Sequence, residues 1–543
     1  MAKLSAVSSI SRSTSDTIQQ LLRERASSDA VAVLFGDEEQ RWHDHVRGAE
    51  ARAATLLALA DRDRPMHVGV LLGNSPEFLS QMAAAGLGGY VLCGINTTRR
   101  GDALGADIRR ADCQLVVTDA DHRHLLDGVD LGDVRVLDAS GDDWQRRVDS
   151  AGALTPYSEA GPLDTFMLIF TSGTSGDPKP VQVSHFMVRM CGEAVVARYG
   201  LTIDDICYLS MPLFHSNAVL AGWAVALATG AAMAPATFSA SRFLDDIRRS
   251  GARYMNYVGK PLAYILATPE RPDDIDNPLR IAVGNEASDR DIEEFGLRFG
   301  CQAWDSFGST ENAVIIIKEP DTPKGSLGKG YPGVAVYSPD TVTECPAARF
   351  DEHGALINAE EAVGELVNTT GGGFFSGYYH AQEATAERMR YGVYWSGDLA
   401  YCDEDGWLYL AGRSGDWLRV DGENMAAAPI ERILSRSPAI NRVAVYGVPD
   451  ETVGDQVMAA VVLNEGCALA PDEFESFLAA QPDLSPKAWP RYVRTAADLP
   501  TTATHKVLKR ELAAQGPTAG DGELWEREAC GTRYRMRDVR PCQ

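Results

Sequence analysis

The sequence predicts an α/β protein with a large N-terminal domain of stacked α/β subdomains and a small C-terminal α+β domain. Short apolar runs alternate with amphipathic segments over most of the chain, which is the pattern of βα units around a mostly parallel sheet. The chain has 543 residues, too many for one hydrophobic core. After about Arg413 the pattern changes to a polar, glycine-containing loop, a helix and two strands, which indicates a separate domain.

Apolar runs in the large domain are expected to form buried strands, because each is short and is bounded by turn-forming or polar residues. The clearest runs are His67 to Gly73, Cys113 to Asp119 and Thr165 to Thr171. The first is followed by residues 76–89, PEFLSQMAAAGLGG, which predict a helix. Strand followed by helix is the repeating unit of a parallel sheet.

The segment from Leu209 to Ala240 contains no Asp, Glu, Lys or Arg. A transmembrane helix needs about 20 continuous apolar residues, and Pro212 and Gly230 interrupt this run. We therefore expect a buried helix over about residues 217–229, ended by Gly230.

The small domain is expected to contain a helix over residues 428–437 and strands over residues 442–448 and 457–463. The residues from about Gly516 onward are expected to form a polar tail.

Composition excludes some classes of function. With 51 basic and 76 acidic residues the net charge is −25, which disfavours nucleic-acid binding. Ten cysteines without a CxxC pair predict reduced thiols and no structural zinc. The first residues lack the apolar core of a signal peptide, so we expect a cytoplasmic protein.

The stretch FTSGTSGDPKP, residues 170–180, concentrates glycines, hydroxyls and one lysine directly after an expected strand. Glycine-rich backbone can turn several N–H groups toward one anion, and the lysine adds a charge. The spacing is not that of the Walker loop. The pattern favours a different phosphate-binding loop, and a solvent-exposed turn is the alternative.

Four motifs occur in order along the chain. They are the loop Thr171 to Lys179, DSFGSTE from Asp305 to Glu311, the segment Tyr394 to Trp417, and LPTTATHKVLKREL from Leu499 to Leu512. With these motifs the chain resembles the adenylate-forming superfamily of acyl-CoA synthetases, nonribosomal adenylation domains and luciferases over nearly its whole length. Segments 212–218, 257–274 and 281–300 resemble the branch of very-long-chain acyl-CoA synthetases and fatty-acid transport proteins, and actinobacterial ligases of steroid side-chain and polycyclic terpenoid acids.

The resemblance implies an AMP-forming acid–thiol ligase. Residues 1–413 would bind adenylate and acyl group, and residues 414–543 would form a mobile domain with a hinge near Gly415. The acid would first join the α-phosphate of ATP, and a thiol would then displace AMP. The implied substrate is a bulky apolar acid, either steroid-like, diterpenoid or long-chain, and the cofactors are ATP (or a supplied acyl-AMP), Mg²⁺ and coenzyme A. A homodimer is left open.

The adenylation step needs cations and aligned N–H groups around the phosphates. By resemblance, Lys506 bridges the carboxylate and the α-phosphate, Thr310 contacts the α-phosphate, and Glu311 binds Mg²⁺. His215 would gate the acyl channel. A surface position is the alternative for Lys506, and a core position is the alternative for His215. The pyrophosphate end of ATP would be held by Thr171, Ser172, Gly173, Thr174, Ser175, Gly176 and Lys179.

The adenosine of ATP needs a flat pocket and contacts to two hydroxyls. Phe307 is expected to stack on adenine, and Asp398 to accept from both ribose hydroxyls with support from Arg413. A turn-capping role is the alternative for Asp398. The loop around Gly422 would approach the pantetheine tunnel. The further nucleotide-binding residues that the resemblance implies are Gly284, Asn285, Glu286, Asp305 and Gly308.

The acyl group is expected to lie among small residues, whose missing side chains would leave room for a ring system. We therefore expect polycyclic acids to be better substrates than short fatty acids. The residues assigned to this pocket are Asn217, Gly222, Tyr257, Gly259, Gly284, Gly308 and Ser309.

Two positions depart from the family pattern. Pro180 stands where relatives usually carry Gly or Ala, and it removes an N–H that could contact phosphate. Asn312 stands where Gly is common and adds a side chain beside Glu311. These changes raise the hypothesis that only the thioester half-reaction survives. The sequence is also compatible with a stand-alone enzyme that loads a carrier protein, and with a non-catalytic acyl-binding or transport component.

Overall fold

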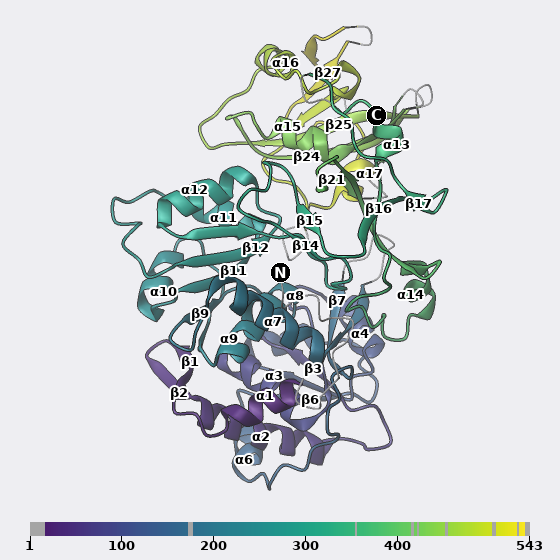
Figure 1. Cartoon of the computed structure of the whole chain (residues 1–543). Coiled ribbons are helices and arrows are strands. Elements are labelled where there is room, and N and C mark those ends of the chain that lie inside the picture. The colour runs from purple at the N-terminus through teal and green to yellow at the C-terminus, as the bar shows by residue number, and fades with distance from the viewer. Residues whose placement is uncertain are drawn as a thin grey trace. The chain divides into compact units, whose positions relative to one another are not determined.

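The computed structural model describes residues 17–171, 178–352, 356–413, 417–420, 423–450, 454–501, 507–528 and 531–537. The chain forms two compact units (Figure 1). Unit 1 is Met1–Ala313 with Gly372–Glu387, and unit 2 is Val314–Gly371 with Arg388–Gln543. The boundary expected after Arg413 falls inside unit 2 and stays a prediction.

The first sheet of unit 1 contains the three strands expected from the apolar runs. Its order is β6-β5-β3-β4-β7-β8, and all neighbours are parallel except β7 and β8. The bounds are β3 (His67–Leu71), β4 (Val91–Gly94), β5 (Leu115–Thr118), β6 (Arg135–Asp138), β7 (Thr165–Thr171) and β8 (Lys179–Ser184).

The second sheet of unit 1 is also mostly parallel. Its order is β13-β12-β11-β9-β10-β1-β2, with only the β1–β2 hairpin antiparallel. The bounds are β1 (Val31–Phe35), β2 (Glu38–Arg41), β9 (Ile206–Leu209), β10 (Ala232–Pro235), β11 (Tyr254–Val258), β12 (Ile281–Asn285) and β13 (Gln302–Asp305). The two sheets confirm the expected α/β class.

Helices lie between and outside the two sheets of unit 1 (Figure 1). The largest hydrophobic cluster joins α3, α7 and α9 (Ala224–Thr229) to both sheets, and smaller clusters cover the outer faces with α4 and with α10 to α12. The helix bounds are α1 (Ile18–Arg25), α2 (Trp42–Leu59), α3 (Pro76–Gly88), α4 (Gly101–Arg110), α5 (Ala120–Arg123), α6 (Asp142–Asp149), α7 (His185–Tyr199), α10 (Phe243–Ser250), α11 (Gly259–Leu266) and α12 (Asp289–Phe299).

The uncharged segment forms a helix that contains an irregular turn. α8 (Ser216–Ala218) continues through a π-helical turn, Val219–Trp223, into α9 (Ala224–Thr229), and Gly230 ends it with φ of 78°. The expected position and end are confirmed, whereas the π turn has no sequence signal. No helix among the described residues is both long and apolar enough to span a membrane.

Two histidines buried in unit 1 make its stability depend on pH. Burial lowers the pKa of His45 and of His185 to about 4, from an ordinary value of 6.5. Both rings are neutral in the folded chain, so their stabilising contribution is complete above pH 6.5 and is lost as the pH falls toward 4.

Lowering the pH from about 7.5 to about 5.0 should therefore remove roughly 2 kcal/mol of unfolding free energy for each of these histidines. Urea unfolding at the two pH values measures the loss. In His45→Gln the loss should shrink by about 2 kcal/mol. An unchanged loss in that variant would contradict the assignment of a depressed pKa.

Unit 2 contains two further sheets. One has the order β14-β15-β21-β20-β18-β16-β17, with β19 beside β20, and the other has the order β23-β22-β25-β26-β27-β28, with β24 beside β25. The first comprises β14 (Ile316–Ile317), β15 (Gly328–Gly330), β16 (Val334–Ser338), β17 (Thr343–Glu344), β18 (Gly364–Asn368), β19 (Met389–Arg390), β20 (Val393–Cys402) and β21 (Trp407–Arg413).

The second sheet of unit 2 carries the elements expected for the small domain. Its strands are β22 (Trp417–Val420), β23 (Glu423–Ala426), β24 (Ile440–Asp450), β25 (Gly454–Leu463), β26 (Tyr492–Thr495), β27 (Leu524–Arg527) and β28 (Tyr534–Met536). The remaining α-helices among the described residues are α13 (Ala359–Ala362), α14 (Gln382–Arg388), α15 (Ala427–Leu434), α16 (Pro471–Ala479) and α17 (Lys509–Ala514). The helix expected near residues 428–437 and both strands are confirmed.

The expected polar tail from Gly516 is wrong where β27 and β28 form. β27 and β28 extend the sheet beside β26, and Trp525 is completely buried in the core of this domain. Each strand is short and carries charged residues beside its buried aromatic, Trp525 in β27 and Tyr534 in β28, so composition alone does not reveal the buried positions.

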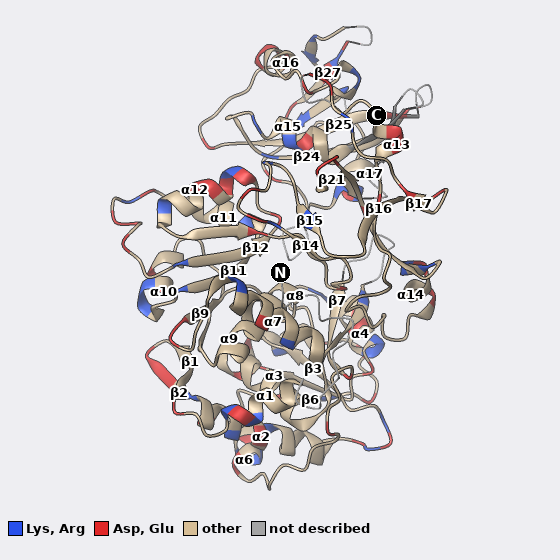
Figure 2. Ribbon diagram, in the orientation of Figure 1, with Lys and Arg blue, Asp and Glu red and all other residues tan. Residues whose placement is uncertain are grey.

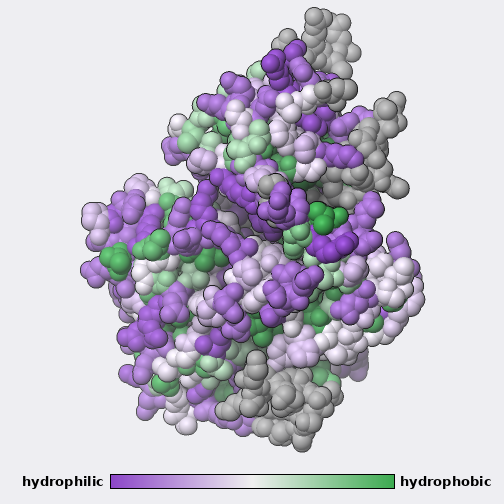
Figure 3. Space-filling model, turned by 45° about the horizontal axis from the view of Figure 1, so that its top comes forward, coloured by the Kyte–Doolittle hydropathy of each residue, from purple (hydrophilic) through white to green (hydrophobic). Residues whose placement is uncertain are grey.

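Acidic residues gather on some elements of the fold and basic residues on others (Figure 2). In Figure 2 acidic residues colour β2 and much of α12, whereas α10 ends in basic residues. On the face that Figure 3 presents, apolar residues form small areas separated by polar ones. The described residues on this face thus offer no broad apolar area of the kind that marks a docking surface.

Candidate active site

The predicted site residues of unit 1 gather at the carboxyl ends of parallel strands. Residues 210–217 follow β9, and Gly259 follows β11. Residues 284–286 lie at the end of β12, and residues 305–311 begin at the last residue of β13. Crevices outside the carboxyl ends of such strands are where α/β proteins bind ligands. The fold therefore assembles motifs that lie far apart in sequence.

Hydrogen bonds connect these strand ends to one another. The Asn217 amide donates to the Tyr257 carbonyl at 3.1 Å and to the Asn285 side-chain oxygen at 3.2 Å. The hydroxyl oxygens of Ser216 and Thr310 lie 3.0 Å apart. Thr310 is therefore held beside Ser216, which directly follows His215. The His215 ring lies 4.5 Å from the ring of its neighbour Phe214, measured between centroids.

The expected adenine wall has a constrained backbone. Glu286 has φ of 68°, a left-handed conformation that costs a non-glycine residue of order 1 kcal/mol. The Ala287 N–H donates to the Asp305 carboxylate at 3.2 Å, and the Ser306 N–H donates to the Gly284 carbonyl at 2.8 Å. These bonds hold the segment that ends β12 against the segment that ends β13, and Phe307 lies on the latter.

Glu311 is the buried carboxylate of this cluster, with 8% of its surface exposed. Its Oε1 accepts a hydrogen bond of 2.6 Å from the Tyr378 hydroxyl. The Lys179 ammonium lies 5.7 Å from the centroid of the same tyrosine ring. Tyr378 was not among the residues predicted from sequence, because nothing local marks one tyrosine of the pair Tyr378-Tyr379 as a site residue.

The predicted phosphate loop is described by the structure only at its two ends. Thr171 ends β7, Lys179 begins β8, and the two residues pair across the strands. The predicted loop residues Ser172, Gly173, Thr174, Ser175 and Gly176 lie outside the described residues.

Pro180 lies on an edge strand, and its missing N–H would not face the loop. The Tyr379 N–H donates to the Pro180 carbonyl at 2.8 Å, and the Gln182 N–H donates to the Gly377 carbonyl at 3.1 Å. In an antiparallel ladder the residues of a hydrogen-bonded pair exchange both bonds, so an N–H at position 180 would point to the Tyr379 carbonyl. The loss of a phosphate donor expected from this proline is therefore not supported by the geometry.

Asn312 adds a side chain that contacts helix α7. Its φ of 48° is left-handed, which explains why glycine suits this position and why asparagine is tolerated. Its side-chain amide donates to the Cys191 sulfur on α7 at 3.2 Å. The bulk added at this position is therefore directed to α7.

Three of the four glycines assigned to the acyl pocket are sites of close packing. A Cβ added at Gly222 would lie 2.8 Å from Asn256 Oδ1. A Cβ at Gly259 would lie 1.9 Å from the Glu286 carbonyl oxygen, and one at Gly284 would lie 2.3 Å from the Tyr257 carbonyl oxygen. Neighbouring protein atoms thus fill the space that the missing side chains would occupy. Only a Cβ at Gly308 would meet no atom within 4 Å.

The residues predicted to bind ribose, Asp398 and Arg413, belong to unit 2. Asp398 on β20 lies opposite Arg413 on β21 in the strand register, and the Asp398 N–H donates to the Ser396 hydroxyl oxygen at 3.0 Å. The Arg413 side chain and the residues Gly415, Gly422 and Lys506 lie outside the described part. Thr501 and Val507 form a β-bridge on either side of the segment that contains Lys506.

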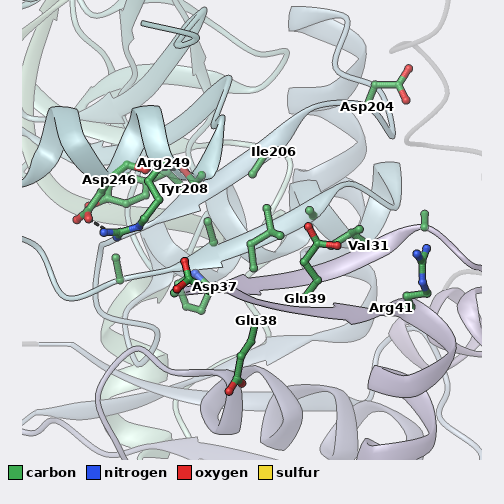
Figure 4. Close-up of a pocket in the computed structure, with 18 of the residues that line it drawn as sticks. Val31, Asp37, Glu38, Glu39, Arg41, Asp204, Ile206, Tyr208, Asp246 and Arg249 are labelled. Atoms are coloured by element: carbon green, nitrogen blue, oxygen red, sulfur yellow. Dashed lines mark hydrogen bonds and ion pairs between the residues drawn. The ribbon is translucent and has the colours of Figure 1, made fainter.

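A separate cavity of about 610 Å³ lies in unit 1 beside the β1–β2 hairpin and α10 (Figure 4). Its lining includes Asp37, Glu38, Glu39 and Asp204, and none of the predicted site residues lines it. The polyphosphate of ATP would meet an acidic wall there, so the cavity does not suit the predicted chemistry.

Comparison with known proteins identifies the family of the chain. The model for AMP-binding enzymes matches residues 22–379, and the model for the AMP-binding enzyme C-terminal domain matches residues 429–506. The chain belongs to the AMP-binding enzyme family. The resemblance and the fold class expected from the sequence are thereby confirmed.

Individual relatives cover nearly the whole chain. A medium/long-chain-fatty-acid–CoA ligase of Mycobacterium marinum, FadD17, is 51% identical, and the match covers 94% of this chain and 98% of that protein. The steroid-22-oyl-CoA synthetase of Rhodococcus jostii is 46% identical, with 92% and 91% covered. The crystal structure of the anthranilate CoA ligase AuaEII with anthranoyl-AMP shares the fold, with a TM-score of 0.81 at 20% identity over 93% of this chain and 99% of that chain.

Proposed function

We propose that the protein is an AMP-forming acyl-CoA ligase that converts a bulky apolar carboxylic acid to its CoA thioester through an acyl-adenylate. The observation that carries this proposal is near-full-length similarity, at 51% and 46% identity, to two relatives named as CoA ligases of different apolar acids. The reaction requires ATP and CoA, and we place it in the cytoplasm.

The adenylation half-reaction forms a bond between a carboxylate oxygen and the α-phosphorus of ATP and releases pyrophosphate. Thr310, fixed beside Ser216, supplies a hydroxyl toward the α-phosphate. Lys179, at the end of the phosphate loop, supplies positive charge toward the pyrophosphate. Lys506 is assigned the contact to both the acid and the α-phosphate, and aligned charges of this kind stabilise the transition state.

Magnesium fits the residues present. The described residues contain no group of three or more His, Cys, Asp or Glu side chains that could hold a metal, and Glu311 offers one buried carboxylate. Mg²⁺ is commonly held by one or two carboxylates together with substrate phosphates. Glu311 would hold the ion, which would neutralise charge on the phosphates.

The thioester half-reaction forms a bond between the CoA sulfur and the acyl carbon and releases AMP. We assign the change between the two steps to rotation about Gly415, because glycine has no Cβ to oppose a large change in dihedral angles. We assign adenine stacking to Phe307, ribose binding to Asp398 and Arg413, and the approach of pantetheine to the segment around Gly422.

We assign the acyl group to the surroundings of Asn217, Tyr257, Ser309 and Gly308, and a Cβ at Gly308 would meet no atom within 4 Å. Gly222, Gly259 and Gly284 contribute by allowing backbone segments to pack closely and do not themselves provide free volume. These three glycines therefore do not explain a preference for bulky acids. A kinetic comparison of acids of different size measures that preference.

The test is mass spectrometry of products from acetate, a long-chain fatty acid, a steroid side-chain acid and a diterpenoid acid, each with ATP, Mg²⁺ and CoA. We expect acyl-CoA and AMP, with kcat/KM at least about tenfold higher for the bulky acids than for acetate, as apolar burial implies. A preference for acetate would reject the proposed substrate class. Faster acylation of a carrier-protein phosphopantetheine than of CoA would favour the stand-alone adenylation enzyme.

A further inference from the structure

A short segment of unit 1 lies along the outer edge of the phosphate-loop sheet. β8 is the last strand in that sheet, and residues 377–379 pair with it through the bonds between Tyr379 and Pro180 and between Gln182 and Gly377. This added pairing fixes Tyr378 directly opposite Val181, close in the chain to Lys179. The segment is far from the loop in sequence.

Tyr378 connects the two groups that are assigned to the phosphates of ATP. Its hydroxyl donates to Glu311 at 2.6 Å, and both side chains are buried, with 5% and 8% of their surfaces exposed. A hydrogen bond to a carboxylate is stronger than one between neutral groups. Its ring lies 5.7 Å from the Lys179 ammonium, within the range of a cation–π interaction.

The tyrosine is itself held in place on its other sides. Its N–H donates to the Thr385 hydroxyl at 3.0 Å, and its ring meets Phe375 edge to face at a centroid distance of 5.0 Å. A side chain fixed in this way restricts the rotation of any carboxylate bonded to it. One oxygen of Glu311 is therefore occupied, and the direction of the other oxygen is set.

We propose that Tyr378 is a positioning residue for adenylation, which orients the Glu311 carboxylate for the metal and links it to Lys179. The inference rests on the proposed function, because it assigns a role in that reaction. Partners that orient metal-binding carboxylates have effects on metal affinity of about 10- to 100-fold when they are removed. A purely structural tyrosine would lower stability without changing the dependence on Mg²⁺.

The test compares Tyr378→Phe with Tyr379→Phe in the full chain. Tyr379 is a matched control because its hydroxyl also donates to a carboxylate, that of Asp112, at 3.0 Å. Calorimetric titration with Mg²⁺ and ATP gives the binding affinity without any turnover. Assays of acid-dependent pyrophosphate exchange and of CoA transfer from synthetic acyl-adenylate give the two half-reactions.

For Tyr378→Phe we expect Mg²⁺–ATP affinity to fall by about tenfold and the Mg²⁺ concentration for half-maximal exchange to rise by a similar factor. CoA transfer should be unchanged, and Tyr379→Phe should resemble the unmodified protein in all three measurements. Unchanged Mg²⁺ dependence in Tyr378→Phe, or equal effects in both variants, would overturn the inference. If the unmodified protein adenylates no acid, the proposed function fails, whereas the calorimetric comparison still decides the role of Tyr378.

Discussion

Lys506→Ala should lower acyl-adenylate formation by roughly 10²- to 10³-fold, since it removes a preorganised positive charge from the developing negative charge on the phosphate. CoA transfer from synthetic acyl-adenylate should be largely intact, because that step does not use the contact assigned to Lys506. Acid-dependent pyrophosphate exchange measures the first half-reaction, and thioester formation from the synthetic adenylate measures the second.

Lys509→Ala is the matched control for this experiment. The Lys509 ammonium forms an ion pair with Glu431 at 2.9 Å, so it has a structural partner within its own domain. We expect its loss to leave both half-reactions close to normal. If Lys506→Ala also left both rates unchanged, or if the two variants were equally impaired, the assignment of Lys506 would be wrong.

Glu311→Gln should have the second largest effect, a loss of adenylation of about 10²-fold. Glutamine can still accept the hydrogen bond of the Tyr378 hydroxyl and has nearly the same shape, so the change removes the charge with little change in packing. Pyrophosphate exchange at several Mg²⁺ concentrations measures the effect, and higher Mg²⁺ should recover part of the rate.

Asp112→Asn makes the same chemical change outside the proposed site. Asp112 accepts a hydrogen bond from Tyr379 and has φ of 49°, a conformation that asparagine tolerates. Exchange activity in this variant should match the unmodified protein. A Glu311→Gln variant with full activity at low Mg²⁺ would show that the metal is held elsewhere.

The sequence predicts well what local patterns encode. The apolar runs that form β3, β5 and β7 and the end of α9 at Gly230 follow from periodicity and turn chemistry. The motif positions at the carboxyl ends of β12 and β13 follow from the family resemblance together with the parallel sheet. In each of these cases the deciding residues lie within a few positions of one another.

Features that depend on distant contacts could not be predicted. The bond between Tyr378 and Glu311 joins residues 67 positions apart, and neither local sequence predicts the other. The sequence alone assigns Gly259 and Gly284 to the acyl pocket. Only the fold shows that the carbonyl oxygens of Glu286 and Tyr257 pack against them. The direction of the missing N–H at Pro180 likewise depends on a segment that pairs with β8 from far along the chain.

The central claim is that the acid is activated as an acyl-adenylate before it meets CoA. The most direct measurement uses a steroid side-chain acid or a long-chain acid labelled with oxygen-18 in its carboxylate, together with ATP, Mg²⁺ and CoA. Attack of the carboxylate on the α-phosphorus leaves one labelled oxygen on AMP when the thioester forms, and mass spectrometry should find this label in AMP and none in pyrophosphate. Label in inorganic phosphate accompanied by ADP, or acyl-CoA formed with unlabelled AMP, would contradict the account.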